Sequence, residues 1–250
     1  SSTNDYAIEL LREPDTPSEL IIVAEHQTNG KGQMGRKWHS SFGNNLNLSY
    51  IIKNITYAPF IFNMAIALGV LEGIRKFPFI EGIKETHINI KWPNDIVLIE
   101  DSGVKKIAGI LIENSWRGET QTASIVGVGV NLDTQFSKEH VSGFNLMPGN
   151  LNDYLSENIS ALNLELPIIN SIQKRIHMLS TERGDEIILT DFNKELFGLN
   201  SERHYTIDNK PFKGTLLGIE KDGLGVFSGI GAENIKVQSS NVVWSFIGGL

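Results

Sequence analysis

Residues 88–98 read Ile88-Asn89-Ile90-Lys91-Trp92-Pro93-Asn94-Asp95-Ile96-Val97-Leu98. Two short apolar runs flank a polar centre in which proline and asparagine follow each other, and this composition is typical of a turn. The stretch therefore predicts two short strands joined by a tight connection. An amide beside a carboxylate at such a turn can hold Mg²⁺ or the polar edge of a ligand. The alternative is that both side chains only satisfy backbone N–H groups of the turn.

Strand and helix patterns surround this turn. Alternation of apolar and polar residues over 46–52 predicts a half-buried strand, with the polar side chains on the solvent side. Further strands are expected over 20–24, 106–113 and 123–130, and helices are expected from residue 2, over 60–77 and in two segments of 168–199 that break near Gly184. The mixture predicts an α+β fold with a β-sheet flanked by helices.

The pattern changes near residue 199. After His204, short apolar runs are separated by Asp208-Asn209 and Asp222-Gly223, which are typical hairpin turns. We expect a larger domain over 1–199, which carries the candidate site, and a small β-barrel over 200–250.

Composition limits the classes of function. The 250 residues include no cysteine, so disulfides, a thiol nucleophile and thiolate metal sites are excluded, and a reducing cytoplasmic location is expected. A formal net charge of −7 argues against general nucleic-acid binding. No apolar run is long enough for a membrane span, so no membrane association is expected.

Positive charge is nevertheless concentrated in one place. Residues 26–71 contain no Asp or Glu, although about five would be expected at the average acid content of the chain. Within this window lies Gly30-Lys31-Gly32-Gln33-Met34-Gly35-Arg36-Lys37-Trp38. Glycines let backbone N–H groups surround an anion, and Lys and Arg neutralise it. The segment lacks the Gly-Lys-Ser/Thr ending of a P-loop and the helix that follows a dinucleotide-binding loop. It is either an anion-binding loop or a mobile surface loop with solvated cations.

Two further stretches combine strand character with small residues. Lys105-Lys106-Ile107-Ala108-Gly109-Ile110-Leu111 and Gly127-Val128-Gly129-Val130-Asn131 both place glycine within an apolar strand. Glycine there leaves room for a ligand on the sheet, or marks a bulge or sheet corner. Lys106 would be a fixed charge beside this space, although a solvated lysine is the default for a single such residue.

The order and spacing of these motifs resemble those of the biotin–protein ligases. The resemblance runs from Ser2-Thr3-Asn4 through Gln27 and the 30–38 loop to Asn45-Leu46, the Lys-Trp-Pro-Asn-Asp turn, the 106–111 string and the 127–131 string. It covers essentially the whole chain. It implies a catalytic domain like that of class II synthetases, and an SH3-like barrel at the C-terminus.

The resemblance implies a reaction in two steps. Biotin and ATP, with Mg²⁺, form biotinoyl-5′-AMP and pyrophosphate, and a lysine of a biotin carboxyl carrier protein domain then takes the biotinoyl group. Asp95 and bulk water both stay open as acceptors of the proton that this lysine loses. No helix-turn-helix pattern precedes Ser2, so the given residues are expected to form a ligase without a DNA-binding domain. The chain does not begin with Met, so an upstream domain stays open, and both a monomer and a homodimer fit the resemblance.

The resemblance also assigns roles to residues. Lys106 and Asp95 would be catalytic, with Asp95 also touching the metal. Biotin would be bound by Ser2, Thr3, Asn4, Gln27, Gly30, Lys31, Gly32, Gln33, Lys106, Gly109, Gly127 and Val128. ATP and the adenylate would be bound by Lys31, Arg36, Trp38, Asn94, Asp95, Lys106 and Asn131.

One departure from the family pattern concerns the loop. Its usual form has arginine at the positions of Lys31 and Gln33. Lysine keeps the charge without the bidentate fork, and glutamine has no charge, so we expect the loop to retain the adenylate less tightly.

Two other functions remain open from the sequence. A lipoate–protein ligase or octanoyl transferase shares the implied fold, and a transferase would not need ATP. A non-catalytic module that binds biotin or the adenylate belongs to another class, and Lys106, Asn94 and Asp95 argue against it.

Overall fold

The computed structural model describes residues 1–137, 145–229 and 233–246. Its main element is a mixed sheet with the strand order β1-β2-β6-β5-β4-β3, to which the short β7 adds in parallel beside β5. The strands are β1 (Glu19–Val23), β2 (Asn45–Lys53), β3 (Ile88–Lys91), β4 (Asp95–Glu100), β5 (Gly103–Arg117), β6 (Thr120–Asn131) and β7 (Met147–Pro148). The predicted hairpin over 88–98 is confirmed as β3 and β4, which pair antiparallel.

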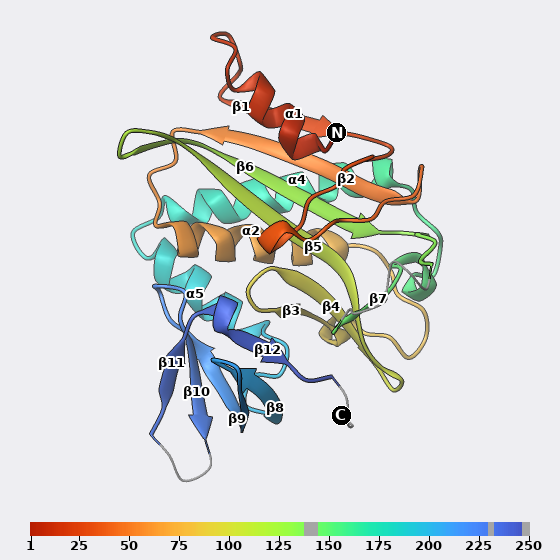
Figure 1. Ribbon diagram of the computed structural model, residues 1–250. Helices are drawn as coiled ribbons and strands as arrows, with labels where there is room; N and C mark the ends of the chain where they lie inside the picture. The colour runs from red at the N-terminus through yellow and green to blue at the C-terminus, as the bar shows by residue number, and fades with distance from the viewer. Residues whose placement is uncertain (138–144, 230–232, 247–250) are drawn as a thin grey trace.

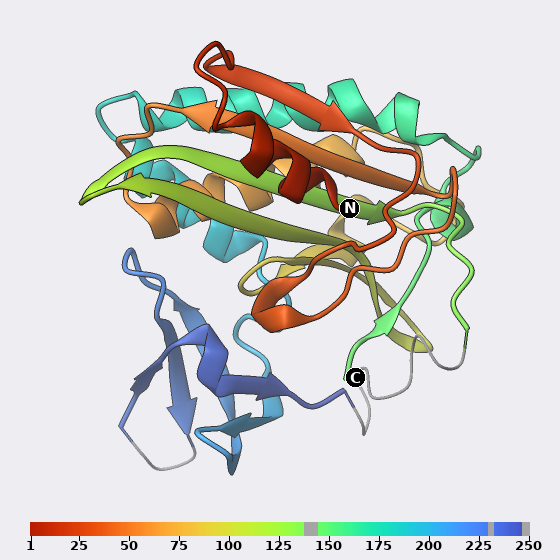
Figure 2. The same cartoon turned by 45° about the horizontal axis from the view of Figure 1, so that its top comes forward.

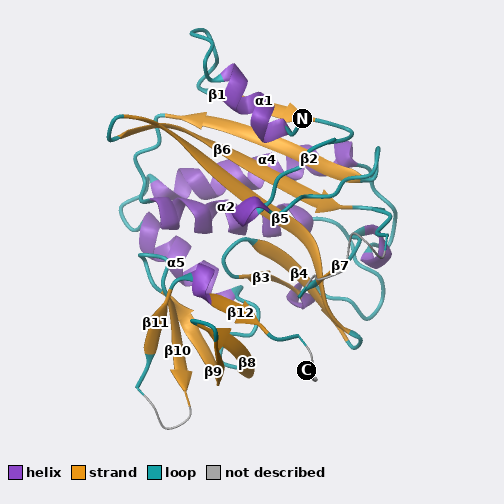
Figure 3. Cartoon of the chain, viewed as in Figure 1, coloured by secondary structure: helices purple, strands orange, loops and turns teal. Residues whose placement is uncertain are grey.

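Helices lie on both faces of this sheet, and one face carries more of them than the other (Figures 1 and 3). The helices α2 (Pro59–Ile74), α4 (Ala161–Leu179) and α5 (Gly184–Lys194) lie on one side, and the short α1 (Thr3–Leu10) lies across β2 and β6 on the other. Helix α2 is apolar on nearly all sides because it is enclosed by the sheet and α4. At Gly69 and Gly73 it approaches α4 so closely that an added Cβ would lie 2.6 Å from the Cα atoms of Ile172 and Ile168.

Strand β2 differs from the prediction. It was expected to be half-buried, but every residue from Asn45 to Ile52 is buried. Leu46, Leu48 and Tyr50 face the large core beneath α2 and α4. The polar side faces α1 and the segment before the 30–38 loop instead of water, because these segments fold back over it. Sequence alternation alone does not indicate this cover.

The C-terminal part forms a second sheet with the order β11-β10-β9-β8-β12. Its strands are β8 (Glu202–Ile207), β9 (Lys210–Ile219), β10 (Gly225–Gly229), β11 (Ile235–Val237) and β12 (Val242–Trp244). The predicted strands and hairpins are confirmed, but the described strands form an open sheet rather than a closed barrel, with β11 and β12 at opposite edges. This arrangement is consistent with the SH3-like domain implied by the sequence.

The packing of this second sheet explains why it does not close. Its aromatic side chains Tyr205, Phe227 and Trp244 contact each other edge to face, with centroids 5.1 Å apart in two pairs. Trp92 from the 91–95 turn and Phe197 pack against this group. The apolar face is thus covered by the larger part of the chain, and closure is not needed to bury it. The domain boundary near residue 199 stays a prediction.

None of the helices in the described ranges is long and apolar enough to cross a membrane.

Candidate active site

Gly109, Gly127 and Gly129 leave one area of the main sheet without side chains of its own, here called the glycine patch. Gly109 of β5 lies directly opposite Gly129 of β6, and Leu111 lies opposite Gly127. A Cβ added at Gly127 would lie 2.5 Å from Oδ1 of Asn4, and one at Gly129 would lie 2.4 Å from the indole of Trp38. Side chains from elsewhere therefore approach the backbone here, as expected for glycine within a strand.

The 30–38 loop forms a flap over this patch (Figure 2). Its two arms are joined by hydrogen bonds from the N–H of Gly32 to the carbonyl of Arg36 (2.8 Å) and from the N–H of Trp38 to the carbonyl of Gly30 (2.9 Å). The tip turns through Met34 and Gly35, both with positive φ. The flap brings Trp38 over the glycine patch, where its indole N–H is buried without a hydrogen-bond partner.

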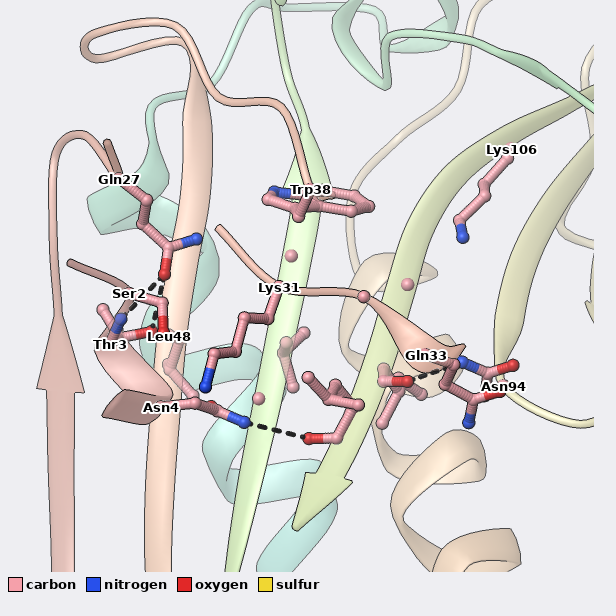
Figure 4. A pocket seen from close by; sticks show the side chains of 17 residues that line it. Ser2, Thr3, Asn4, Gln27, Lys31, Gln33, Trp38, Leu48, Asn94 and Lys106 are labelled. Atoms are coloured by element: carbon pink, nitrogen blue, oxygen red, sulfur yellow. Dashed lines mark hydrogen bonds between the residues drawn. The ribbon is translucent and has the colours of Figure 1, made fainter. Parts of the chain in front are cut away.

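A pocket lies between the flap and the sheet (Figure 4). The pocket is lined by Ser2, Thr3, Asn4, Gln27, Lys31, Gly32, Gln33, Trp38, Leu48, Asn94, Lys106, Gly109, Ile110, Leu111, Gly127, Val128 and Gly129. The hydroxyl and amide groups of residues 2–4 and Gln27 lie at one end, with Lys31 beside Asn4, and Lys106 lies toward the other end, on the same side as Asn94 and Gln33.

The polar end is built at the start of α1. The side chain of Ser2 caps this helix by accepting a hydrogen bond from the N–H of Asp5 at 3.0 Å, which confirms the helix expected from residue 2. Oε1 of Gln27 accepts from the backbone N–H of Thr3 at 2.8 Å and lies 3.2 Å from the hydroxyl oxygen of the same residue. The amide of Asn4 donates to Glu113 at 2.7 Å. Segments far apart in the sequence thus form one hydrogen-bonded cluster.

The charged end centres on Asp95. Its carboxylate lies 2.5 Å from Nζ of Lys106 and 3.3 Å from Nζ of Lys91. Burial alone would raise the pKa of Asp95, but the attraction of the two ammonium groups outweighs it and lowers that pKa. Burial lowers the pKa of Lys91, and the charge of Asp95 offsets this only in part. Lys106 is less buried than Lys91 and lies 5.8 Å from the ring centroid of Trp38. It is therefore the cation of this group that faces the pocket.

Lys31 connects the flap to α1 through an ion pair with Asp5. The hydrogen bond from this ammonium to Asp5 raises the pKa of Lys31. Its side chain extends across the pocket between Asn4 and Trp38 (Figure 4). One cation of the acid-free segment 26–71 is thus paired with an acid from another part of the chain.

Most residues singled out in the sequence meet at this pocket, and four do not line it. Gly30 lines a neighbouring hollow of the loop. Arg36 is exposed at the base of the flap tip. Asp95 lies behind Lys106, and Asn131 is buried, with its amide donating to the backbone carbonyl of Lys106 at 3.3 Å.

Val128 lines the pocket differently from what was predicted. It points away from Gly127 and Gly129 on the strand, and its side chain belongs to the core under the helices. Only its backbone can border a ligand on the glycine patch.

A magnesium site at Asp95 is poorly supported by the geometry. Both carboxylate oxygens already lie against ammonium groups. The described residues include no group of three His, Asp or Glu side chains that could hold a metal ion. The role of Asp95 as a metal contact stays a prediction, and the observed contacts suit it to hold Lys106 in place.

Comparison with known proteins places this site in a family. Residues 1–131 match the family described as "Biotin/lipoate A/B protein ligase family". The bifunctional ligase/repressor BirA of Escherichia coli is 30% identical over 240 residues, which cover 89% of this chain and 68% of that protein. The chain belongs to the biotin/lipoate A/B protein ligase family.

Two further comparisons define the extent of this similarity within the family. The BirA protein of Bacillus spizizenii is 29% identical over 90% of this chain, and the match spans 66% of that longer protein. The biotin protein ligase of Aquifex aeolicus, solved in complex with biotin and ATP, superposes with a TM-score of 0.73 at 21% identity, covering 97% of this chain and 94% of that one. The fold expected from the sequence is thereby confirmed.

Sequence reasoning missed several residues that line the pocket. These are Leu48, Ile110, Leu111 and Gly129, and the pairing of β5 with β6 is the signal that could have indicated the last three, whereas the side chain of Leu48 belongs to the core. Asn47 and Ser49 were also missed, because their alternation in β2 predicted exposure. Both are fully buried beneath the polar end.

Proposed function

We propose that this protein activates biotin with ATP and transfers it to a lysine of a biotin carboxyl carrier protein domain. The single observation that carries the proposal is the pocket with the hydroxyl and amide groups of residues 2–4 and Gln27 at one end, a slot bordered by glycines, and Lys106 at the far end. Biotin has the same three parts in the same order: a ureido ring, an apolar body and chain, and a carboxylate. The names of the relatives support this assignment.

In the first step, a carboxylate oxygen of biotin attacks the α-phosphorus of ATP. The new O–P bond forms as the bond to the β-phosphate oxygen breaks, and pyrophosphate leaves. Both reactants are anionic, so their approach requires positive charge at the point of contact. Lys106 would supply it, with Asp95 and Lys91 fixing its position from behind. Asn94, with its amide donating to the carbonyl of Ile110 at 2.6 Å, fixes the turn beside it.

In the second step, the amine of the carrier lysine attacks the activated carbonyl. A C–N bond forms, the bond to the AMP oxygen breaks, and the amine loses a proton. Asp95 is a poor acceptor for this proton because two ammonium groups lower its pKa. We infer that water takes the proton.

Magnesium would enter with the nucleotide. When bound to the triphosphate, Mg²⁺ neutralises phosphate charge and usually keeps several waters. We assign no reaction step to a metal ion bound by the protein itself, because both carboxylate oxygens of Asp95 contact lysines. The absence of cysteine supports a cytoplasmic setting for this activity.

The polar end favours biotin over lipoate or octanoate. Ser2, Thr3, Asn4 and Gln27 place hydroxyl and amide groups at the end of the slot. A ureido ring can pair with such groups, whereas an apolar head would leave them desolvated and unpaired. The lipoate ligase and octanoyl transferase are thereby less favoured alternatives.

The deciding experiment measures the release of pyrophosphate from MgATP in the absence of a carrier protein. Biotin, lipoate and octanoate are compared as the carboxylic acid substrate. Release with biotin alone is expected. Release with lipoate or octanoate instead would move the protein to another branch of the family. No release with any acid would reject ATP-dependent activation and favour a transferase or a binding module.

Replacing Gln33 with arginine is expected to slow dissociation of biotinoyl-5′-AMP about tenfold, because a charge-assisted hydrogen bond replaces a neutral one. Gln33 lines the pocket from the flap. The measurement is the release rate of preformed adenylate from the wild type and the variant. The variant Gln238→Arg adds the same charge on an exposed residue outside the pocket and serves as the control. An unchanged release rate in Gln33→Arg would reject the loop as the cause of weak retention.

Two glycine-to-alanine variants should separate the two ends of the pocket. Gly127→Ala forces Asn4 to move, and Gly129→Ala forces Trp38 to move. We expect the first to raise KM for biotin and the second to raise KM for ATP, each about tenfold, since overpacking costs about 1–3 kcal/mol. Steady-state kinetics with each substrate varied in turn test this. The same KM rising in both variants would contradict the assignment of the two ends.

A further inference from the structure

One side of β2 carries a row of buried polar residues. Asn45, Asn47 and Ser49 alternate along the strand and each has no exposed surface. Buried polar groups must be hydrogen-bonded, so the partners of this row are informative. Asn47 and Ser49 both contact residues that line the pocket, without lining it themselves.

Asn47 belongs to a chain of amides with a fixed direction. The backbone N–H of Thr3 can only donate, so the atom of Gln27 that faces it is Oε1. Nε2 of Gln27 must then point to Oδ1 of Asn47, at 3.1 Å. Nδ2 of Asn47 donates to the carbonyl of Ala24 at 3.2 Å, and this carbonyl can only accept. Backbone groups at both ends therefore determine the orientation of both amides.

Ser49 fixes the side-chain orientation of Asn4 and Thr3 in a similar way. The amide nitrogen of Asn4 faces Glu113 and the backbone carbonyl of Leu111, both of which only accept. Oδ1 of Asn4 must then face the hydroxyl of Ser49, at 2.5 Å. Because the single hydrogen of Ser49 goes to Asn4, the oxygen of Ser49 accepts from the hydroxyl of Thr3 at 2.7 Å. One buried serine thus connects the two side chains at the start of α1.

The network leaves specific bonding groups for a ligand. One hydrogen on Nε2 of Gln27 and the hydroxyl hydrogen of Ser2 remain as donors, since the oxygen of Ser2 accepts from Asp5. Lone pairs on Thr3 and Asn4 remain as acceptors. Donors for a carbonyl oxygen beside acceptors for N–H groups match a cyclic urea.

We propose that Asn47 and Ser49 are positioning residues that fix the hydrogen-bond polarity of the polar end and thereby select a ureido ring over an apolar head. The inference rests on the proposed function. Asn47 acts through Gln27, and Ser49 acts through Thr3 and Asn4. Without them these groups would have alternative orientations, of which only some match the ligand.

The test uses Ser49→Ala and Asn47→Leu, with Ser124→Ala as a matched control. Ser124 is equally buried on the same sheet, but its hydroxyl bonds to Asn114 and Gln121, away from the pocket. We expect KM for biotin to rise about tenfold in both positioning variants, with KM for ATP changed less than about twofold, since each variant removes a buried hydrogen bond and leaves its partner free to turn away from the ligand. Ser124→Ala should change neither KM. Equal rises for both substrates, or the same rise in the control, would indicate a general structural effect and overturn the proposal.

A second measurement does not depend on activity. In the ligand-free wild type, the side-chain amide of Gln27 should give two separate NMR proton signals, one of them protected from solvent exchange by Asn47. That protection should be lost in Asn47→Leu and retained in Ser124→Ala. If the wild type releases no pyrophosphate with biotin, the proposed function fails, and the amide protection alone decides whether Asn47 orients Gln27. Unchanged protection in Asn47→Leu would overturn the positioning role.

Discussion

Lys106→Ala is expected to reduce biotin-dependent pyrophosphate release about 10²–10³-fold, because one preorganised charge contact in the transition state contributes about 3 kcal/mol. Lys106 combines exposure to the pocket with a position fixed by a buried carboxylate. Asp95 holds its ammonium at 2.5 Å, and its aliphatic chain lies beside Gly109. The ring of Trp38 covers it from the flap side. A group held in this way needs little rearrangement when charge develops on the reacting oxygens.

The matched control is Lys105→Ala. Lys105 is the preceding residue of β5, so its side chain points to the opposite face of the sheet, where it contacts Gly149. Its removal eliminates the same charge outside the pocket, and turnover should change less than about twofold. Turnover of Lys106→Ala equal to that of the wild type would reject the catalytic assignment. Equal losses in both variants would indicate that overall charge matters rather than the position of Lys106.

Asp95→Ala is expected to lower the free energy of unfolding by about 3–5 kcal/mol, because removal of one partner leaves an uncompensated buried charge. The charge left behind is that of Lys91, which lies between the main sheet and the C-terminal sheet, 5.9 Å from the ring centroid of Trp244. Denaturant titration of the wild type and the variant gives this difference. The control is Asp185→Ala, which removes an exposed partner of Lys221 and should cost less than about 1 kcal/mol.

The loss of folding stability at low pH offers an independent check on Asp95. Its pKa in the folded protein is lowered, so the unfolded chain binds the proton more readily. The stabilisation is therefore fully present above the ordinary pKa of about 3.9 and is lost as the pH falls through the lower folded value. The variant Asp95→Asn should show a shallower loss of stability below about pH 4. If the free energy of unfolding of the variant fell with pH as steeply as that of the wild type, Asp95 would not carry this charge interaction.

These predictions depend on a site that is only partly visible in the sequence. The glycine-basic loop, the Lys-Trp-Pro-Asn-Asp turn and the Lys106 string all border or support one pocket, as the resemblance implied. They are detectable because each is a local pattern in which glycine, proline or a fixed charge has a direct chemical consequence. The pairing of β5 with β6, and hence the meeting of Gly109 with Gly129, also follows from neighbouring strands that are adjacent in the chain.

The long-range contacts were not predictable in the same way. The partnership of Lys31 with Asp5 and that of Asp95 with both Lys91 and Lys106 depend on how separate elements approach one another. The small SH3-like domain expected for the C-terminal segment is present as an open antiparallel sheet of the described strands, and Trp92 and Phe197 cover the apolar face that closure would have buried.

The sequence by itself determined the family, the order of most strands and helices, and the residues that carry charge to the site. These features depend on composition and on spacing along the chain. The tertiary structure decided which polar residues are buried and which way they face. Asn47 and Ser49 are the clearest case, since their alternation in β2 predicts exposure to water, yet α1 and Gln27 fold over them. Burial of a polar group is set by what packs on it, and in this protein the covering residues lie 20 residues (Gln27 to Asn47) and 46 residues (Thr3 to Ser49) away along the chain.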